Sequence, residues 1–131
     1  DKPWAFDKWD LLTNSDHYGS LFSQGTAVIK AQDQQVASTA SYARSCKING
    51  ATGLSVNTNV HISEVGHELA NKSETFGLIW YLNADNRANC SLRSNGDYDV
   101  SALAKLFGGG GGHKNAAGFN TDVSKLLEFL Q

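Results

Sequence analysis

The segment FGGGGGHKNAAGF, residues 107–119, is the stretch around which the rest of the chain is organised. Its five consecutive glycines, 108–112, lead directly into His113, Lys114 and Asn115. A glycine run loses more backbone entropy on folding than other sequences, so a compact domain keeps one where the backbone must approach a partner closely or offer N–H groups to an anion. His, Lys and Asn side chains can all donate hydrogen bonds to a phosphate. The segment is therefore interpreted as a phosphate-binding loop, and the alternative is a flexible linker.

The two best-known phosphate-loop patterns do not describe this segment. The pattern GxxxxGK[ST] needs Lys and then Ser or Thr directly after its last glycine, whereas this chain has His113, Lys114 and Asn115 there. The pattern GxGxxG is matched only trivially by a glycine run, and a predicted helix rather than a strand precedes this one.

Composition places limits on the class of protein. The 131 residues are 40% hydrophobic and 10% aromatic, which is typical of one globular domain with a real core. The net charge of −2 argues against a broad basic surface for long duplex nucleic acid, but it allows a small anionic ligand held by a few local groups. Cys46 and Cys90 have no ligand spacing, so we expect free thiols in a reducing, cytoplasmic compartment. No segment predicts a membrane span or a signal peptide, and the lack of methionine predicts a processed or excised chain.

Hydrophobic periodicity predicts an α/β (α+β) domain, a small mixed β-sheet covered by helices and preceded by a helical linker. An N-terminal arm and linker helix are expected over residues 1–50, with an aromatic arm at 1–23, and a second domain over 51–131. The predicted helices are 24–46, 61–72, 99–107 and a C-terminal one that starts near 121; the predicted strands are 53–59, 76–82 and 87–94.

The predicted strand at 87–94 is the most informative of these elements. Its residues alternate strictly between apolar and polar, with Ala88, Cys90 and Leu92 on one face. Ser91 and Arg93 therefore project together from the polar face. A guanidinium group beside the backbone amides of the glycine run suits a terminal phosphate.

No metal site is predicted in this chain. His67 and Glu68 begin an HExxH pattern, but Asn71 stands where the second His is needed. The run Asp16-His17-Tyr18 lacks a second His and does not follow an apolar strand.

Three blocks together resemble the DHHA1 domain, the C-terminal half of the DHH/DHHA1 phosphoesterases such as RecJ-type exonucleases and oligoribonuclease/pAp-phosphatases. The blocks are SLRS at 91–94, DVSALAKLFGGGGGH at 99–113 and KNAAGF at 114–119, and the upstream segment 56–70 resembles the family's strand-to-helix unit. Alanyl-tRNA synthetases carry a related domain, but their glycine block is usually not followed by HKNAAG. The resemblance covers residues from about 53 to 131 and supports the fold class above.

The resemblance implies a division of labour with a DHH domain that this chain lacks. That domain would hold two divalent metals, usually manganese, and hydrolyse phosphodiester or phosphomonoester bonds; this chain would bind a short single-stranded oligonucleotide or nucleoside phosphate and be inactive alone. By resemblance, Arg93 and Ser91 hold a substrate phosphate, and His113 with the glycine backbone touches the phosphate nearest the metals and assists catalysis in the parent enzyme. Lys114 and Asn115 line or support the loop. The implied binding residues are Ser91, Arg93, Gly110, Gly111, Gly112, His113, Lys114 and Asn115.

Two alternatives stay open from the sequence. The chain could be a stand-alone nucleotide-binding module without catalytic activity, or the glycine run could serve only to close the fold. The run also has five glycines where the family usually has four, and the sequence does not tell which one is extra.

Overall fold

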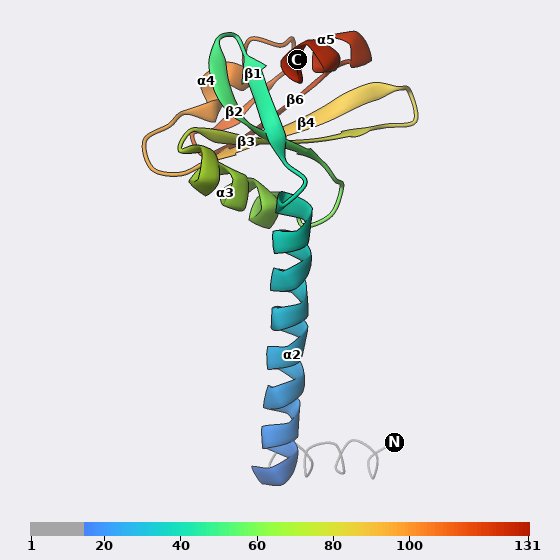
Figure 1. The fold of residues 1–131 in the computed structure, drawn as a ribbon, viewed down its shortest axis with the longest axis vertical. Coiled ribbons are helices and arrows are strands. Elements are labelled where there is room, and N and C mark those ends of the chain that lie inside the picture. The colour runs from blue at the N-terminus through green and yellow to red at the C-terminus, as the bar shows by residue number, and fades with distance from the viewer. Residues whose placement is uncertain (1–14) are drawn as a thin grey trace. The chain divides into compact units, whose positions relative to one another are not determined.

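A computed structural model describes the chain from residue 15 to residue 131, with side chains from residue 24 onward (Figure 1). Contacts divide the chain into two compact units, Asp1–Gln35 and Val36–Gln131. The helix α2, Ser15–Ala40, begins in the first unit and ends in the second. Residues 1–14 of the aromatic arm predicted for residues 1–23 lie outside the described residues. The remaining residues of the predicted arm belong to α2.

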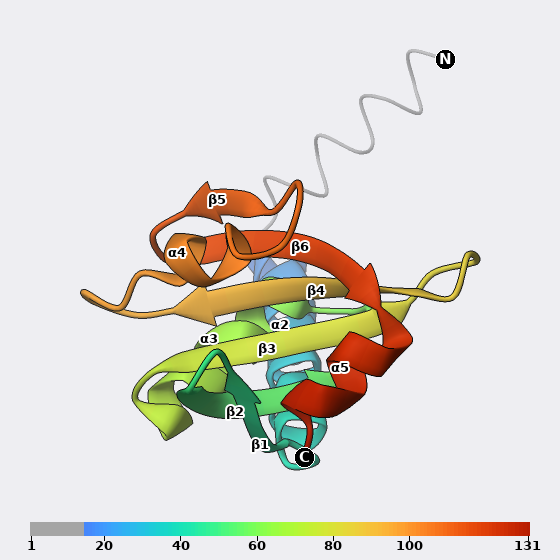
Figure 2. The ribbon, with the colours of Figure 1, turned by 90° about the horizontal axis from the view of Figure 1, so that it is seen from above.

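The second unit is built on a mixed six-stranded sheet, which confirms the predicted fold class. The strands lie in the order β1-β2-β3-β4-β6-β5, and among these described strands only the pair β2–β3 is parallel (Figure 2). Their bounds are Arg44–Ile48 for β1, Ala51–Asn57 for β2, Phe76–Leu82 for β3, Arg87–Ser94 for β4, Gly111–His113 for β5 and Ala116–Asp122 for β6.

Helices cover both faces of this sheet. The helix α3, Ile62–Ser73, connects the parallel strands β2 and β3 and packs on one face together with the last turn of α2. The short helices α4, Val100–Ala104, and α5, Val123–Phe129, lie on the opposite face (Figure 2). We call the side of the sheet that carries α3 the α3 face.

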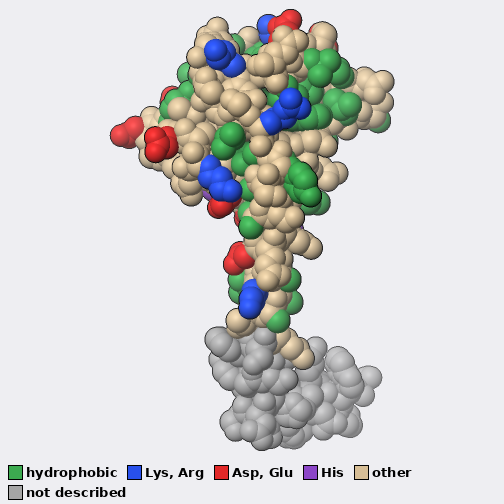
Figure 3. Space-filling view, viewed as in Figure 1, with side chains coloured by type: hydrophobic (Ala, Val, Ile, Leu, Met, Phe, Trp, Pro, Cys, Tyr) green, Lys and Arg blue, Asp and Glu red, His purple; other side chains and the backbone are tan. Residues whose placement is uncertain are grey.

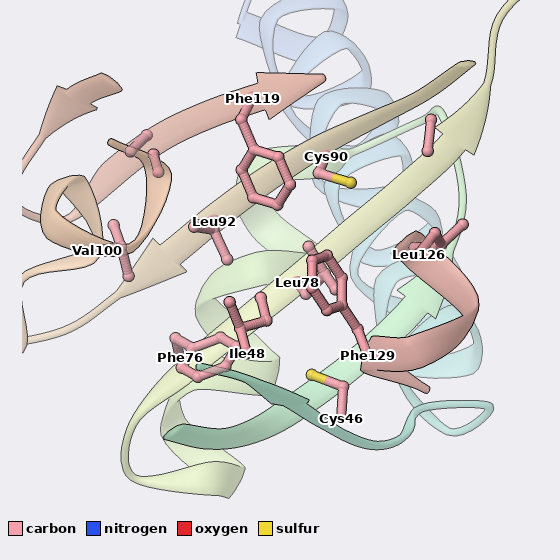
Figure 4. Close-up of a cluster of buried hydrophobic side chains, with 13 residues drawn as sticks. Cys46, Ile48, Phe76, Leu78, Cys90, Leu92, Val100, Phe119, Leu126 and Phe129 are labelled. Carbon is pink, nitrogen blue, oxygen red and sulfur yellow. The ribbon is translucent and has the colours of Figure 1, made fainter. Parts of the chain in front are cut away.

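The main core lies between the sheet and α4 and α5. It joins side chains from β1, β3, β4 and β6 to both helices, including Ile48, Leu78, Leu92, Phe119 and Phe129 (Figure 4). A smaller cluster on the α3 face contains residues of α2, β2, β3 and α3: Ala40, Val56, Val65, Leu69 and Ile79. The strand alternation predicted for β4 is thus confirmed by burial on the α4/α5 side.

The predicted helix at 24–46 was too long, because it included a strand. The helix α2 ends at Ala40, and β1 follows at Arg44–Ile48. Asn49 and Gly50 form the turn between β1 and β2 with φ angles of 50° and 86°. Asn-Gly is the favoured pair for such a hairpin, because both central residues need a positive φ.

The C-terminal third contains two strands that were not predicted from the sequence. The last two glycines of the run belong to β5, and the AAGF segment begins β6. The helix predicted for 99–107 is shorter, since α4 ends at Ala104 and a turn takes the chain into the glycines. The other predicted elements are confirmed to within a few residues: β2, α3, β3, β4 and α5. No helix in the described part of the chain is long and apolar enough to cross a membrane.

Candidate functional site

Strand register brings four of the predicted binding residues, Ser91, Arg93, Gly111 and His113, onto one face of the sheet. Arg93 of β4 lies opposite Ala116 of β6, which lies opposite His113 of β5. Directly opposed residues in antiparallel strands point to the same face, and Arg93 points away from the buried Leu92. We call this line the Arg93–His113 row. Its ends are two strand spacings apart, about 10 Å between Cα atoms.

A second row lies two residues further along β4. Ser91 pairs with Gly118, and Gly118 pairs with Gly111. We call this the Ser91–Gly111 row, and it lies on the same α3 face as the first. Both rows are partly open to solvent, since Ser91, Gly118 and Gly111 are half-buried. A shallow surface of small residues with a guanidinium at one end and an imidazole at the other is suited to an anionic ligand.

The guanidinium of Arg93 is held in place by two hydrogen bonds within the domain. Nη1 donates to the Leu92 carbonyl oxygen at 2.9 Å, and Nη2 donates to Ser63 Oγ at 3.4 Å. Burial lowers the pKa of Arg93, and the nearby Glu64 carboxylate raises it. Since an arginine starts above pKa 12, the group stays protonated at neutral pH. Its position is fixed while part of its hydrogen-bonding capacity remains for a ligand.

The first turn of α3 lies beside this guanidinium. Ser63 belongs to that turn. His61, the residue before the helix, has left-handed φ and ψ angles of 52° and 41° and provides no side-chain cap. The first backbone N–H groups of a helix have no intrahelical partner and carry partial positive charge, so they favour an anion. The acidic side chain of Glu64 in the same turn opposes that attraction.

Gly66 of α3 was not among the predicted site residues, although it shapes this site. A Cβ at this position would meet Cγ and Cβ of Arg93 and Cδ1 of Ile79. The aliphatic part of Arg93 therefore packs against α3 where α3 has no side chain. A glycine within an otherwise helical apolar pattern is a signal of such close packing, and it could have been found in the sequence.

Most of the glycine run is required by the fold. Gly112 has a φ of 147°, and a Cβ on it would lie 2.6 Å from the Ala116 carbonyl oxygen. Gly110 touches the Ala104 carbonyl group so closely that a Cβ cannot be accommodated, and its N–H donates to the Phe107 carbonyl oxygen at 2.8 Å. The run is thus a turn that leads into an edge strand, and the N–H of Gly110 is used within the protein.

Gly111 is different from these neighbours. Its φ is not positive, and a Cβ built on it would meet no atom within 4 Å. Gly108 is equally open, but it precedes β5 and does not belong to the two rows. The fold therefore tolerates a side chain at Gly111, on the strand at the edge of the open face.

Two phenylalanines hold the ends of this segment together. The rings of Phe107 and Phe119 are stacked with centroids 4.0 Å apart, and Phe129 packs edge-on against both. This aromatic cluster fixes β5 relative to β6. Within the described residues β5 is the last strand of the sheet, so its outer backbone edge is not paired with another strand.

The structure gives Lys114 and Asn115 supporting contacts. Lys114 Nζ lies 3.2 Å from Asp97 Oδ1 in an exposed ion pair. Asn115 Nδ2 donates to Ser94 Oγ at 2.9 Å and to the Gly96 carbonyl oxygen at 3.2 Å. These bonds connect the β5–β6 turn to the end of β4, so Asn115 maintains the register that aligns the two rows.

Charges outside the two rows are dispersed. On the face drawn in Figure 3, Lys and Arg side chains form isolated groups among uncharged ones rather than a continuous basic patch. In the part of the chain that the structure describes, no group of three or more His, Cys, Asp or Glu residues could hold a metal ion.

Comparison with known proteins identifies the family. The family model of the DHHA1 domain matches residues 54–131, and the chain belongs to this family. It is 42% identical over 43 residues to a 3′,5′-cyclic-nucleotide phosphodiesterase of Helicobacter pylori; the match covers 33% of this chain and 12% of that protein. It also resembles the crystal structure of an uncharacterized protein from Helicobacter pylori G27, with a TM-score of 0.50 and 27% identity over 64% of this chain and 27% of that one. The chain thus spans a small part of the length of either relative.

Proposed function

We propose that this chain is the substrate-binding domain of a DHH-type phosphoesterase and that it binds the phosphate of a nucleotide or short single-stranded oligonucleotide. Membership in the DHHA1 family and the likeness to a cyclic-nucleotide phosphodiesterase support a nucleotide ligand. Arg93, with Ser91 beside it, binds the phosphate through charge-assisted hydrogen bonds. His113 approaches from the opposite end of its row and assists the reaction of the complete enzyme.

One observation carries this proposal: Gly111 has no side chain although the fold does not require that. Gly110 and Gly112 are explained by contacts within the protein, but Gly111, at the β5 end of the Ser91–Gly111 row and two residues before His113, faces open space. A glycine in this place lets a ligand lie directly on the backbone of the sheet. A purely structural role for the glycine run would leave this residue without a reason.

Hydrolysis belongs to another part of the complete enzyme in this proposal. The described side chains do not fit a two-metal centre, so both divalent metals, with manganese as the expected ion, are assigned to a DHH domain. Bound there, the metals would supply an activated water for attack on phosphorus. This domain contributes orientation and positive charge, which are themselves large terms in phosphoryl transfer.

The proposal is tested by an NMR titration of the 131-residue chain with a 5′-phosphorylated dinucleotide, without metal. We expect shifts at residues 91–94 and 110–115 in the natural chain. Gly111→Ala should keep the backbone spectrum of the folded protein and lose most of the binding, because the new methyl group occupies the ligand's place. Gly108→Ala is the matched control, since it adds the same methyl group in equally open space outside the two rows.

The outcome is informative in both directions. Loss of binding in Gly111→Ala with retention in Gly108→Ala supports the site. Unchanged binding in both variants, or no shifts with the natural chain up to millimolar dinucleotide, would contradict a phosphate site on this face.

A further inference from the structure

A third row of polar side chains continues the α3 face beyond the proposed phosphate site. Tyr81 of β3 pairs with Asn89 of β4, and Asn89 pairs with Asn120 of β6. Asn89 is two residues from Ser91 on the same strand, so this Tyr81–Asn120 row lies directly beside the Ser91–Gly111 row. Successive rows are about 6.8 Å apart along the strand.

The side-chain amides of Asn89 and Asn120 do not take part in the hydrogen bonds that hold the fold together. Neither Asn89 nor Asn120 makes a side-chain hydrogen bond within residues 15–131. Other asparagines of the domain contrast with them: Asn57 donates to the Trp80 carbonyl oxygen, Asn83 accepts from the backbone of its turn, and Asn115 holds the β5–β6 turn. Asn89 is nevertheless half-buried, so a partly desolvated donor and acceptor are left for an outside partner.

Room for a flat ring exists at the Tyr81 end of this row. Tyr81 is half-buried and lines a shallow hollow of about 610 Å³, whose other lining residues are Asn57, Thr58, Asn59, Trp80 and Leu82. The hollow lies at the carboxyl ends of the parallel strands β2 and β3, where ligands commonly bind in open sheets. Its aromatic and amide lining suits a heterocycle better than it suits an aliphatic group.

We infer that the Tyr81–Asn120 row binds the nucleobase of the nucleotide whose phosphate lies at Arg93. The inference rests on the proposed function and extends it along the sheet. From one end to the other, the three rows offer cations, then a hydroxyl with glycine backbone, then amides with an aromatic ring. A nucleotide presents phosphate, sugar and base in the same order, so one molecule laid along β4 meets a suitable group at each step.

The chemistry of the amides indicates which bases are favoured. An asparagine presents a donor and an acceptor side by side and pairs bidentately with a base edge that does the same, such as N6 and N7 of adenine. Adenine is therefore the preferred base. The Tyr81 ring adds stacking, which tolerates any base.

The inference is tested with two ligands that differ only in the base: adenosine 5′-monophosphate and ribose 5-phosphate. Affinities and backbone shifts are measured on the full 131-residue chain, its Asn89→Ala and Asn120→Ala variants, and Ser45→Ala as a control. Ser45 is an exposed strand position on β1, outside all three rows. A backbone spectrum of each variant confirms that it is folded.

We expect adenosine 5′-monophosphate to bind roughly tenfold or more tightly than ribose 5-phosphate, and either asparagine variant to remove most of that preference. Ser45→Ala should keep it. Equal affinities, with shifts confined to Arg93 and the glycine segment, would overturn the base subsite and leave the phosphate site intact. Binding of neither ligand would overturn the phosphate site and the base subsite together.

Discussion

Arg93 is held in one position by contacts within the domain. Its stem packs against Gly66, and its guanidinium bonds to Leu92 and Ser63. Arg93→Ala should weaken binding of a 5′-phosphorylated dinucleotide by about 1.5–3 kcal/mol, the range for a charge-assisted hydrogen bond. Arg93→Lys should recover only part of this, because an ammonium lacks the two-pronged geometry. Titration calorimetry measures both.

Lys114→Ala is the informative comparison for Arg93. Its ammonium is paired with Asp97 in an exposed ion pair of the kind that contributes little. Removing it should change dinucleotide affinity less than removing Arg93 does. Equal losses in Lys114→Ala and Arg93→Ala would contradict the assignment of the phosphate to Arg93.

Gly66→Ala tests the packing that holds Arg93. The new Cβ meets Cβ and Cγ of Arg93 and the end of Ile79, so α3 or the arginine must move. We expect a loss of about 1–3 kcal/mol in the free energy of unfolding, as for other overpacked positions, together with weaker dinucleotide binding. Urea denaturation measures the first effect.

Gly25→Ala in α2 is the control for this substitution. It makes the same change within a helix but meets no atom within 4 Å, so it should stabilise the helix by roughly 0.5–1 kcal/mol. If Gly66→Ala were as well tolerated as Gly25→Ala, the close contact between α3 and Arg93 would not be energetically important.

Residues could be predicted from the sequence where a local rule decides their position. Alternation alone placed Ser91 and Arg93 on one face. Asp99 is of a residue type that favours the N-cap, and in the structure its carboxylate accepts from Ser101 N at the start of α4. The pattern of α3 marks Gly66 as a position of close packing. That Gly66 and Ser63 both contact Arg93 depends on which helix packs over which strand. That contact joins residues about 30 positions apart, so no local pattern contains it.

At the scale of elements, the carboxylates that cap two helices make the stability of the fold depend on pH. Asp122 Oδ1 accepts from Lys125 N and Ser124 Oγ at 3.1 Å each, and these bonds lower the pKa of the carboxyl group. The pKa of Asp99 is lowered in the same way, mainly by Ser101. A folded pKa below the unfolded one gives stability that is present above the unfolded value of about 3.9 and is lost as pH falls through the folded value.

We therefore expect the thermal midpoint to decrease as pH is lowered from about 5 toward 2. Asp122→Asn keeps an acceptor at the cap but cannot be protonated in this range, so its midpoint should decrease less steeply. Thermal unfolding followed by circular dichroism at several pH values measures both proteins. A variant that loses stability with pH as steeply as the natural chain would show that Asp122 does not contribute to the acid dependence.

The elements that could not be predicted from the sequence are those whose local preference is weak. The strand β1 contains Ser, β5 contains Gly, and β6 contains Ala and Gly, all residues with little preference for strands. The strand β5 is also only three residues long. Their conformation comes from pairing with a neighbour: β1 closes a hairpin on β2, and β6 joins β4 to β5. By contrast, β3 and β4 have continuous or alternating apolar residues and could be predicted directly. The glycine run forms a strand because it pairs with β6, and no local pattern in the run indicates that pairing.

At the scale of the whole second unit, one core joins the first strand to the last helix. Ile48 of β1 and Phe129 of α5 belong to the same buried cluster as Leu78 and Leu92 of the central strands (Figure 4). The three rows of the α3 face lie on the opposite side of the strands that this cluster fixes. The proposed ligand-binding residues from β4, β5 and β6 thus depend on a core to which they do not themselves belong.

The two cysteines report directly on this core. Cys46 of β1 and Cys90 of β4 are both buried in it, and burial raises the pKa of Cys46 to about 11 and that of Cys90 to about 12. At pH 8 both thiols are therefore protonated and shielded, so a thiol reagent such as dithionitrobenzoate should modify them only when the protein opens. Since β1 and β4 share one cluster, both should react at the same slow rate, measured by mass spectrometry of the labelled peptides. In denaturant both should react at once.

Faster labelling of Cys46 in the folded protein would instead show that β1, at the edge of the sheet, detaches by itself and that the core does not open as one unit.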